Sequence, residues 1–228
     1  MSSEAEQSDG YFGCACGKIR IDAVQPPSSS FVTPMAALCQ CHDCFNFADK
    51  VEKFWKEKLP GSSEKADALS DSNASDARQI YKSDVVKITG EEYLQGIKLR
   101  ENSPCIRYYS TCCGTPLMIN YKIMPFFLVY QHTIAAQETS RNEVGVREPR
   151  FQRIPPTVVL NHKSASAGSA PTPEGIPVHD NVSFGFIAHA LTRAIVGLVT
   201  FKKGCAVTPK LEKVPINIGA EYIGGIGG

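Results

Sequence analysis

Cysteine is the residue type best able to do chemistry in this 228-residue chain, which contains nine cysteines. Most of them fall in three short clusters, namely Cys14 and Cys16, then Cys39, Cys41 and Cys44, then Cys112 and Cys113. Cysteines spaced this closely rarely reach the geometry of a disulfide. Thiolates at such spacings are typical ligands of zinc. The clusters therefore predict metal binding through sulfur, while Cys105 and Cys205 stand apart and are expected as small core side chains.

The first and last clusters have the pattern of two halves of one closed zinc site. Cys14-Ala15-Cys16-Gly17 supplies two sulfurs, and Cys112-Cys113-Gly114 supplies two more. The glycine after each pair permits the positive φ that such a turn often needs. Because adjacent side chains in a strand point to opposite faces, Cys112 and Cys113 can share one ion only if the backbone turns sharply between them. Cys105 is the alternative fourth ligand of this structural zinc.

The middle cluster, Cys39-Gln40-Cys41-His42-Asp43-Cys44, offers three thiolates at the start of an expected helix. The positive end of the helix dipole lowers thiol pKa values, which favours metal binding and nucleophilicity. Three thiolates on one zinc leave a fourth position free, as in reactive rather than structural sites. His42 is a candidate fourth ligand, although its ring is expected to point away from the cluster. In the alternative interpretation, the chain binds one zinc and these cysteines form a redox-sensitive thiol group.

The elements that must position these cysteines are mainly strands. Strands are expected at the end of Tyr11–Ala23 and over Phe31–Leu38, Gln79–Tyr81, Val85–Thr89, Tyr93–Arg100, Cys105–Tyr109, Leu117–Tyr121 and Phe126–Tyr130. A short helix is expected after the middle cluster, because Phe47, Val51, Phe54 and Trp55 recur at helical spacing. Asp43 is its expected N-cap, and Pro60-Gly61 its end.

Three regions are expected along the chain. Residues 1–10 are polar and predict a disordered tail, and residues 11–135 predict the zinc domain. Within that domain, residues 61–77 are rich in Ser, Asp and Ala and predict a solvated insertion. Residues 136–228 predict a C-terminal extension that leads out of the domain and carries a helix over about 182–200. That helix includes His189 and Arg193, which argue for a buried or partner-facing helix and against a membrane span.

The overall composition excludes some classes of partner. With a net charge of +1, the chain has no global field that would attract nucleic acid or an anionic membrane. The acidic, polar N-terminus is unlike a signal or transit peptide, which predicts a reducing compartment. The expected location is the cytoplasm, with the nucleus left open.

Four motifs, in this order, make residues 11–130 resemble the CENP-V/GFA family, which is named for glutathione-dependent formaldehyde-activating enzymes. The motifs are Gly13–Arg20, Cys39–Cys44, Arg107–Tyr109 and Cys113–Leu117. The resemblance implies a zinc-bound β-sandwich-like fold with two ions, one structural and one more labile. By position, it implies that Cys14, Cys16 and Cys113 bind the first ion and that Cys39, Cys41 and Cys44 bind the reactive one.

The implied activity is that of a carbon–sulfur lyase acting on a thiol–aldehyde adduct, such as the adduct of glutathione and formaldehyde. The sequence departs from the family at Ser110, where a cysteine is expected, and at Phe45-Asn46-Phe47, where basic residues are common. The second departure removes charge that would attract glutathione. Arg107, Tyr108 and Tyr109 are interpreted as packing residues. The competing hypothesis is a non-catalytic, zinc-stabilised interaction module whose C-terminal helix binds a partner.

Overall fold

The computed structural model describes residues 10–24, 35–58, 74–122, 124–134, 153–161, 172–181, 185, 187–188, 191–192, 195, 211 and 213–218. Residues 1–9 of the expected tail, the insertion up to residue 73, Cys205 and most of the expected C-terminal helix lie outside these residues. Gly10, the last residue of the expected tail, is instead buried and begins a strand. The described part is mainly β, as the sequence predicts. Within it, no helix is both long enough and apolar enough to cross a membrane.

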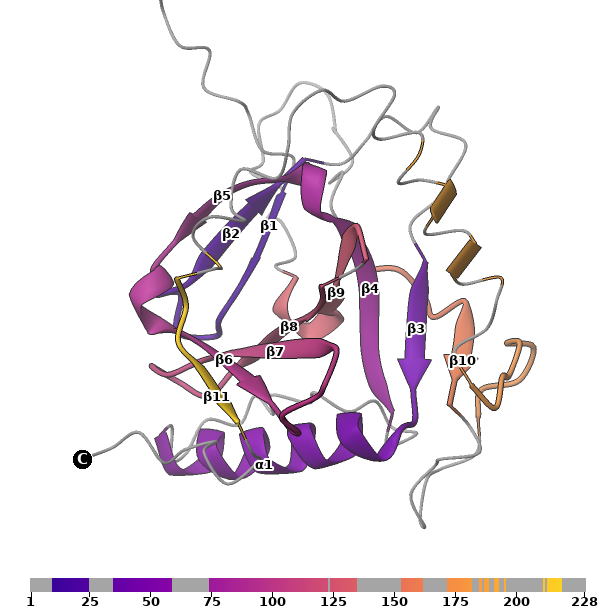
Figure 1. Cartoon of the computed structure of the whole chain (residues 1–228), viewed down its shortest axis with the longest axis horizontal. Helices are drawn as coiled ribbons and strands as arrows, with labels where there is room; N and C mark the ends of the chain where they lie inside the picture. Colours follow the sequence, from indigo (N-terminus) through magenta and orange to yellow (C-terminus); the bar gives the residue numbers. More distant parts are fainter. Residues whose placement is uncertain are drawn as a thin grey trace, which may run out of the picture.

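The strands form two sheets (Figure 1). The small sheet has the order β1-β2-β5, with β1 at Gly10–Gly13, β2 at Arg20–Ala23 and β5 at Val85–Thr89. The large sheet has the order β10-β3-β4-β9-β8-β7-β6-β11. Its strands are β3 (Ala36–Cys39), β4 (Ser75–Tyr81), β6 (Leu94–Lys98), β7 (Cys105–Ser110), β8 (Pro116–Tyr121), β9 (Phe126–Tyr130), β10 (Val158–Leu160) and β11 (Ile216–Ile218). Short 3-10 turns occupy Lys82–Asp84, Glu91–Tyr93 and Gln131–Thr133.

Two hydrophobic cores lie on opposite faces of the large sheet. The core between the sheets includes Phe12, Ile21, Ile88 and Met118. The other core packs helix α1 (His42–Lys58) against the large sheet through apolar side chains such as Phe47 and Val51. Burying each of these side chains contributes about 1.5–3 kcal/mol. In Figure 1, strands β6, β7 and β8 of the large sheet lie between the small sheet and α1.

Helix α1 matches the apolar spacing in the sequence, because Phe47, Val51 and Phe54 are all buried. The helix begins at His42, inside the middle cluster. Asp43 therefore lies in the first turn and is not the N-cap, and its carboxylate pairs with Arg100.

The segment after residue 135 differs most from the expectation. β10 pairs in parallel with β3, and β11 pairs in parallel with β6, so the C-terminal segment supplies both edges of the large sheet. Leu211 and Val214 are also buried in the core between the sheets. The expectation of an extension that leads out of the domain was therefore wrong for these residues. The expected insertion is also shorter, because β4 begins at Ser75.

Candidate metal centres

Four cysteines from distant parts of the chain meet at the edge of the core between the sheets. The Sγ atoms of Cys14, Cys16, Cys112 and Cys113, hereafter the first cysteine group, all lie within 4.8 Å of one another. Four of the six separations lie between 3.3 Å, for Cys16 and Cys112, and 4.0 Å, for Cys112 and Cys113. A tetrahedral zinc with Zn–S bonds of about 2.3 Å holds its sulfurs about 3.8 Å apart. The group therefore fits a zinc ion, and no described cysteine forms a disulfide.

Two tight turns present these sulfurs. Gly17 and Gly114 follow the two pairs, and both have φ of 76°, as the sequence predicts. The Gly17 amide donates to the Cys14 carbonyl, and the Gly114 amide donates to the Ser110 carbonyl. β7 ends at Ser110, so the chain turns over residues 111–113 and both neighbouring cysteines reach the group.

Hydrogen-bond donors surround two of the sulfurs in the first group. The Ile19 amide donates to Cys14 Sγ over 3.2 Å, and the hydroxyls of Ser110 and Thr115 lie 3.1 Å from Cys113 Sγ. The pKa of Cys113 falls to about 4, because the Cys14 thiol and then these hydroxyls bond to its sulfur, and this outweighs the opposing effect of burial. The bond to Cys113 raises the pKa of Cys14. The local structure thus favours a negative sulfur at Cys113, the form that binds a metal.

Cys105 lies apart from the first group and faces the opposite core. Its Sγ atom accepts a hydrogen bond from Arg107 Nη1 over 3.1 Å. The structure therefore groups Cys112, and not the alternative Cys105, with the first three sulfurs.

The second cysteine group, Cys39, Cys41 and Cys44, lies where β3 leads into α1, and its Sγ atoms are within 4.8 Å of one another. The Cys39 and Cys41 sulfurs are 3.5 Å apart, and the Cys44 amide donates to Cys41 Sγ. The pKa of Cys44 lies well below its usual value, because the Cys39 and Cys41 thiols bond to it and Arg107 adds its charge. The bonds of Cys39 with Cys41 and then with Cys44, together with burial, raise the pKa of Cys39. This group also fits a metal ion.

His42 does not join the second group. Its exposed ring lies 2.9 Å from the Asn46 side-chain amide, one helical turn further along α1. The ring therefore points away from the sulfurs, as the sequence predicts.

Arg107 is a buried cation beside the second group, whereas the sequence predicted it to be a packing residue. It is 1% exposed, and its guanidinium lies over the Phe47 ring. Burial opposes its charge, but the negative charges of Cys44 and Cys105 outweigh that effect and raise its pKa. Three thiolates around a divalent ion would leave one negative charge, which a buried guanidinium offsets. The feature of the sequence that could have indicated this role is a single cation in the buried strand Cys105–Ser110.

Asn161 is a second residue beside this group whose role the sequence did not reveal. It follows β10, whose Leu160 lies opposite Cys39 in the parallel register. The Asn161 side-chain amide donates to Cys39 Sγ over 3.2 Å. The residue has φ of 58°, and it is the one non-glycine residue with a positive φ in the described part of the chain.

A cavity of about 190 Å³, hereafter the apolar cavity, adjoins the second group. Cys39 and Cys44 form part of its wall, and Asn161 and Ile187 contribute to it from the C-terminal segment. The rest of its lining is mainly apolar and comes from Ala37, Ala77, Ile119, Met124, Phe126, Leu128 and Leu160, with Ser75 and Tyr121. None of these described lining residues is a lysine, an arginine or a carboxylate.

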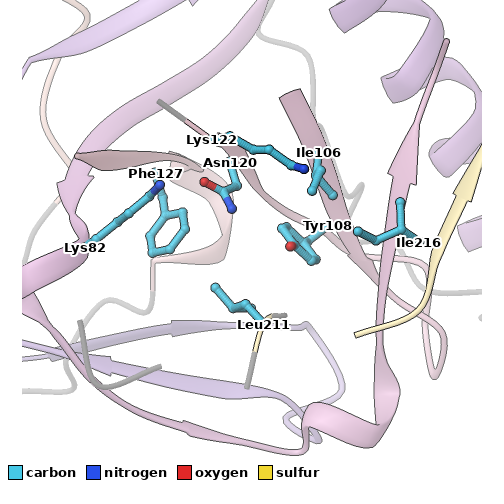
Figure 2. A pocket seen from close by; sticks show the side chains of 8 residues that line it. All are labelled: Lys82, Ile106, Tyr108, Asn120, Lys122, Phe127, Leu211 and Ile216. Atoms are coloured by element: carbon cyan, nitrogen blue, oxygen red, sulfur yellow. The ribbon is translucent and has the colours of Figure 1, made fainter. Parts of the chain in front are cut away.

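A larger cavity, of about 400 Å³, lies on the opposite face of the large sheet (Figure 2). Lys82 and Lys122 line it together with Tyr108, Asn120 and apolar side chains. Its described lining contains no cysteine, so it reaches neither cysteine group. Tyr108 is thus a cavity-lining residue, whereas Tyr109 packs edge-on against Phe54.

Comparison with known proteins gives no match to a protein-family model or to a curated protein. The chemistry of the chain is therefore inferred from the geometry of its two cysteine groups.

Proposed function

We propose that this chain binds two zinc ions and catalyses the reversible addition of a small thiol to an aldehyde. Cys14, Cys16, Cys112 and Cys113 would hold a structural ion. Cys39, Cys41 and Cys44 would hold a more labile, reactive ion. The order of the cysteine motifs also supports our proposal of a CENP-V/GFA-type fold and a carbon–sulfur lyase activity.

The observation that carries the proposal is the apolar cavity beside the second cysteine group. Cys39 and Cys44 line this cavity, whereas no cysteine of the first group lines either of the two cavities described above. The first group also has four sulfurs, enough to fill a tetrahedral site, and the second group has three. A site with an unfilled position next to a cavity is suited to a substrate, and a filled site is suited to holding the fold together.

The proposed reaction needs no oxidant. The thiol sulfur forms a bond to the aldehyde carbon, the carbonyl π electrons move to oxygen, and the proton lost by sulfur ends on that oxygen. The reverse reaction breaks the same carbon–sulfur bond. Zinc bound by three thiolates supplies a Lewis acid with capacity for a further ligand.

The residues of the chain have three tasks in this reaction. The cysteines of the second group hold the ion, and Arg107 offsets their excess negative charge from the buried side. The apolar walls of the cavity exclude water, which strengthens electrostatic interactions with the reacting atoms. The position of the cavity beside the second group supports catalysis over a purely structural role for that group.

The experiment has two stages. Native mass spectrometry of the purified chain should give two zinc ions, and the Cys39→Ser variant should retain one. NMR should then show that the zinc-loaded chain accelerates adduct exchange between ¹³C-formaldehyde and thiols, glutathione among them, and that Cys39→Ser does not. Equal rates with and without protein across the panel would remove the enzymatic proposal. A wild-type content of one zinc would favour the redox-sensitive thiol alternative.

One observation favours the alternative of a non-catalytic interaction module. Leu191 and Ile195 are 48% and 62% exposed at helical positions of the C-terminal segment. Exposed apolar side chains on one helix can form part of a partner-binding surface. This alternative predicts that the double substitution of both residues by glutamate abolishes partner binding, while zinc content and adduct exchange are unchanged.

A further inference from the structure

The chain after residue 135 contributes three side chains to the wall beside the second cysteine group. Asn161 donates to Cys39 Sγ, and Leu160, Asn161 and Ile187 line the apolar cavity. They are more than a hundred residues from the cysteines in sequence. Their presence makes the C-terminal segment part of the candidate reactive site.

The position of Asn161 is fixed by its backbone. β10 pairs with β3 from Val158 to Leu160, and the Leu160 carbonyl accepts the Gln40 amide over 3.0 Å. Asn161 then takes the left-handed conformation, which asparagine tolerates better than most residues. Residues held in such conformations cluster at functional sites. Here the conformation is combined with a side-chain bond to the Cys39 sulfur.

The size of the apolar cavity limits what it can hold. Its volume is about 190 Å³, and an apolar cavity of about 150 Å³ is known to bind benzene. A single aromatic ring or a short alkyl chain therefore fits. Drug-sized ligands use pockets of about 300–1,000 Å³, so a tripeptide such as glutathione is too large to enter whole.

The chemistry of the lining limits the ligand further. The described walls offer no cation for a carboxylate and no carboxylate for an ammonium group. Burying an unpaired charge is strongly unfavourable. Asn161, Ser75 and Tyr121 are the polar side chains in the described lining, and they can serve an uncharged polar group.

We propose that the C-terminal segment completes the reactive site and selects small, uncharged, apolar thiols and their aldehyde adducts. Asn161 is a positioning residue that fixes the Cys39 sulfur, and Ile187 closes the cavity around the hydrocarbon part of the substrate. This inference rests on the proposed function, because it names the substrate class of that site. In the reaction, the carbon–sulfur bond forms or breaks as above, with the substrate hydrocarbon in the apolar cavity.

The first test measures thiol binding to the zinc-loaded full chain by calorimetry. From propanethiol to pentanethiol, affinity should increase about fourfold per methylene until the cavity is full. The matched probe 3-mercaptopropane-1-sulfonate has the chain length of propanethiol with a terminal charge, and it should bind at least about tenfold more weakly. Equal or tighter binding of the sulfonate, or of glutathione, than of the alkyl thiols would overturn the inference.

A pair of variants locates the binding at the apolar cavity. Ile187→Glu places a charge at the cavity wall and should reduce pentanethiol affinity about tenfold or more. Leu191→Glu makes the same change one helical turn away at an exposed position, and affinity should be unchanged. Equal effects of the two substitutions would contradict the role of Ile187.

The second test separates the Asn161 amide from its backbone conformation. Asn161→Gly keeps access to positive φ and removes the amide, whereas Asn161→Ala removes the amide and adds backbone strain. Both variants should bind zinc at the second group about tenfold to hundredfold more weakly in chelator competition, as loss of a bond to a metal ligand does. The cobalt-substituted variants should also show a shifted sulfur-to-cobalt absorption band.

The outcomes separate this inference from the proposed function. If Asn161→Gly retains wild-type affinity and spectrum while Asn161→Ala weakens binding, the residue serves the backbone alone and the positioning role is wrong. If the chain exchanges glutathione adducts faster than adducts of alkyl thiols, the proposed function survives and the substrate class is wrong. If no thiol adduct exchanges faster with the protein than without it, both the proposed function and the substrate class are wrong.

Discussion

Replacing Arg107 with methionine should weaken zinc binding at the second cysteine group about tenfold to hundredfold, and leave the first group unchanged. The substitution removes a guanidinium that is 1% exposed and keeps a long apolar side chain in its place. Arg107 hydrogen-bonds Cys44 and Cys105 and supports the charged form of Cys44. Without Arg107, the net negative charge of three thiolates and one divalent ion would have no buried counter-charge.

The magnitude follows from the contact. Two unit charges about 4 Å apart attract by about 4 kcal/mol at an effective dielectric constant of about 20, which sets an upper bound. The variant also avoids the cost of burying the guanidinium, so the net effect is smaller. Hydrogen bonds to charged groups contribute about 1.5–3 kcal/mol, which corresponds to the expected tenfold to hundredfold range.

The assay is competition for zinc with a series of chelators, read by native mass spectrometry so that chains with one and two ions are counted separately. Arg78→Met is the matched control, because Arg78 is also a buried arginine, and burial alone lowers its pKa to about 10. The control should keep both ions at wild-type affinity. If Arg107→Met keeps the second ion as tightly as the wild type, or if Arg78→Met loses it equally, the charge-balance reasoning is wrong.

Three further predictions concern the first group and the titration of one histidine. Cys112→Ser should lose the first zinc whereas Cys105→Ser should keep both, because only Cys112 lies with the other three sulfurs; zinc counts by mass spectrometry decide between them. Gly17→Ala should destabilise the zinc-loaded chain by about 1–2 kcal/mol. The cost comes from the backbone alone, because φ is 76° at Gly17 and an added Cβ would meet no atom within 4 Å. Denaturant unfolding measures the effect, and an unchanged midpoint would contradict the turn geometry. Burial, with the charge of Arg153, lowers the pKa of His132 to about 4. The unfolded chain takes up this proton near pH 6.5, so the free energy of unfolding should decrease as the pH falls from about 6.5 to about 4. His132→Gln should reduce this slope, and identical slopes would show that His132 does not cause it.

Local patterns made much of the fold predictable. The alternation and apolar runs marked β5 and β9 at their observed bounds, and the spacing of Phe47, Val51 and Phe54 marked the buried face of α1. The cysteine spacings also indicated which sulfurs can share an ion, because each half of the first group is a local turn with its own glycine.

Long-range placement was less accessible from sequence. β10 has three residues, and it is a strand only because the edge of β3 is available to pair with it. Asn161 gains its role from that pairing, since nothing in its neighbours indicates a contact with Cys39. Arg107 was closer to detection, because a cation two residues from Cys105 in a strand lies on the same face as that cysteine.

The pairing of β10 with β3 links the completion of the sheet to the assembly of the second group. Without β10, β3 would be an edge strand with unpaired backbone groups next to Cys39, and such edges invite pairing with other chains. β10 covers that edge, and the same register sets Leu160 opposite Cys39 and delivers Asn161 to its sulfur. The second group therefore cannot reach its observed environment until the chain has folded as far as Asn161. The sulfurs of the first group lack this dependence, because both of its halves belong to residues 14–113. The first ion should consequently bind early and stabilise the sheets on which the second site is assembled.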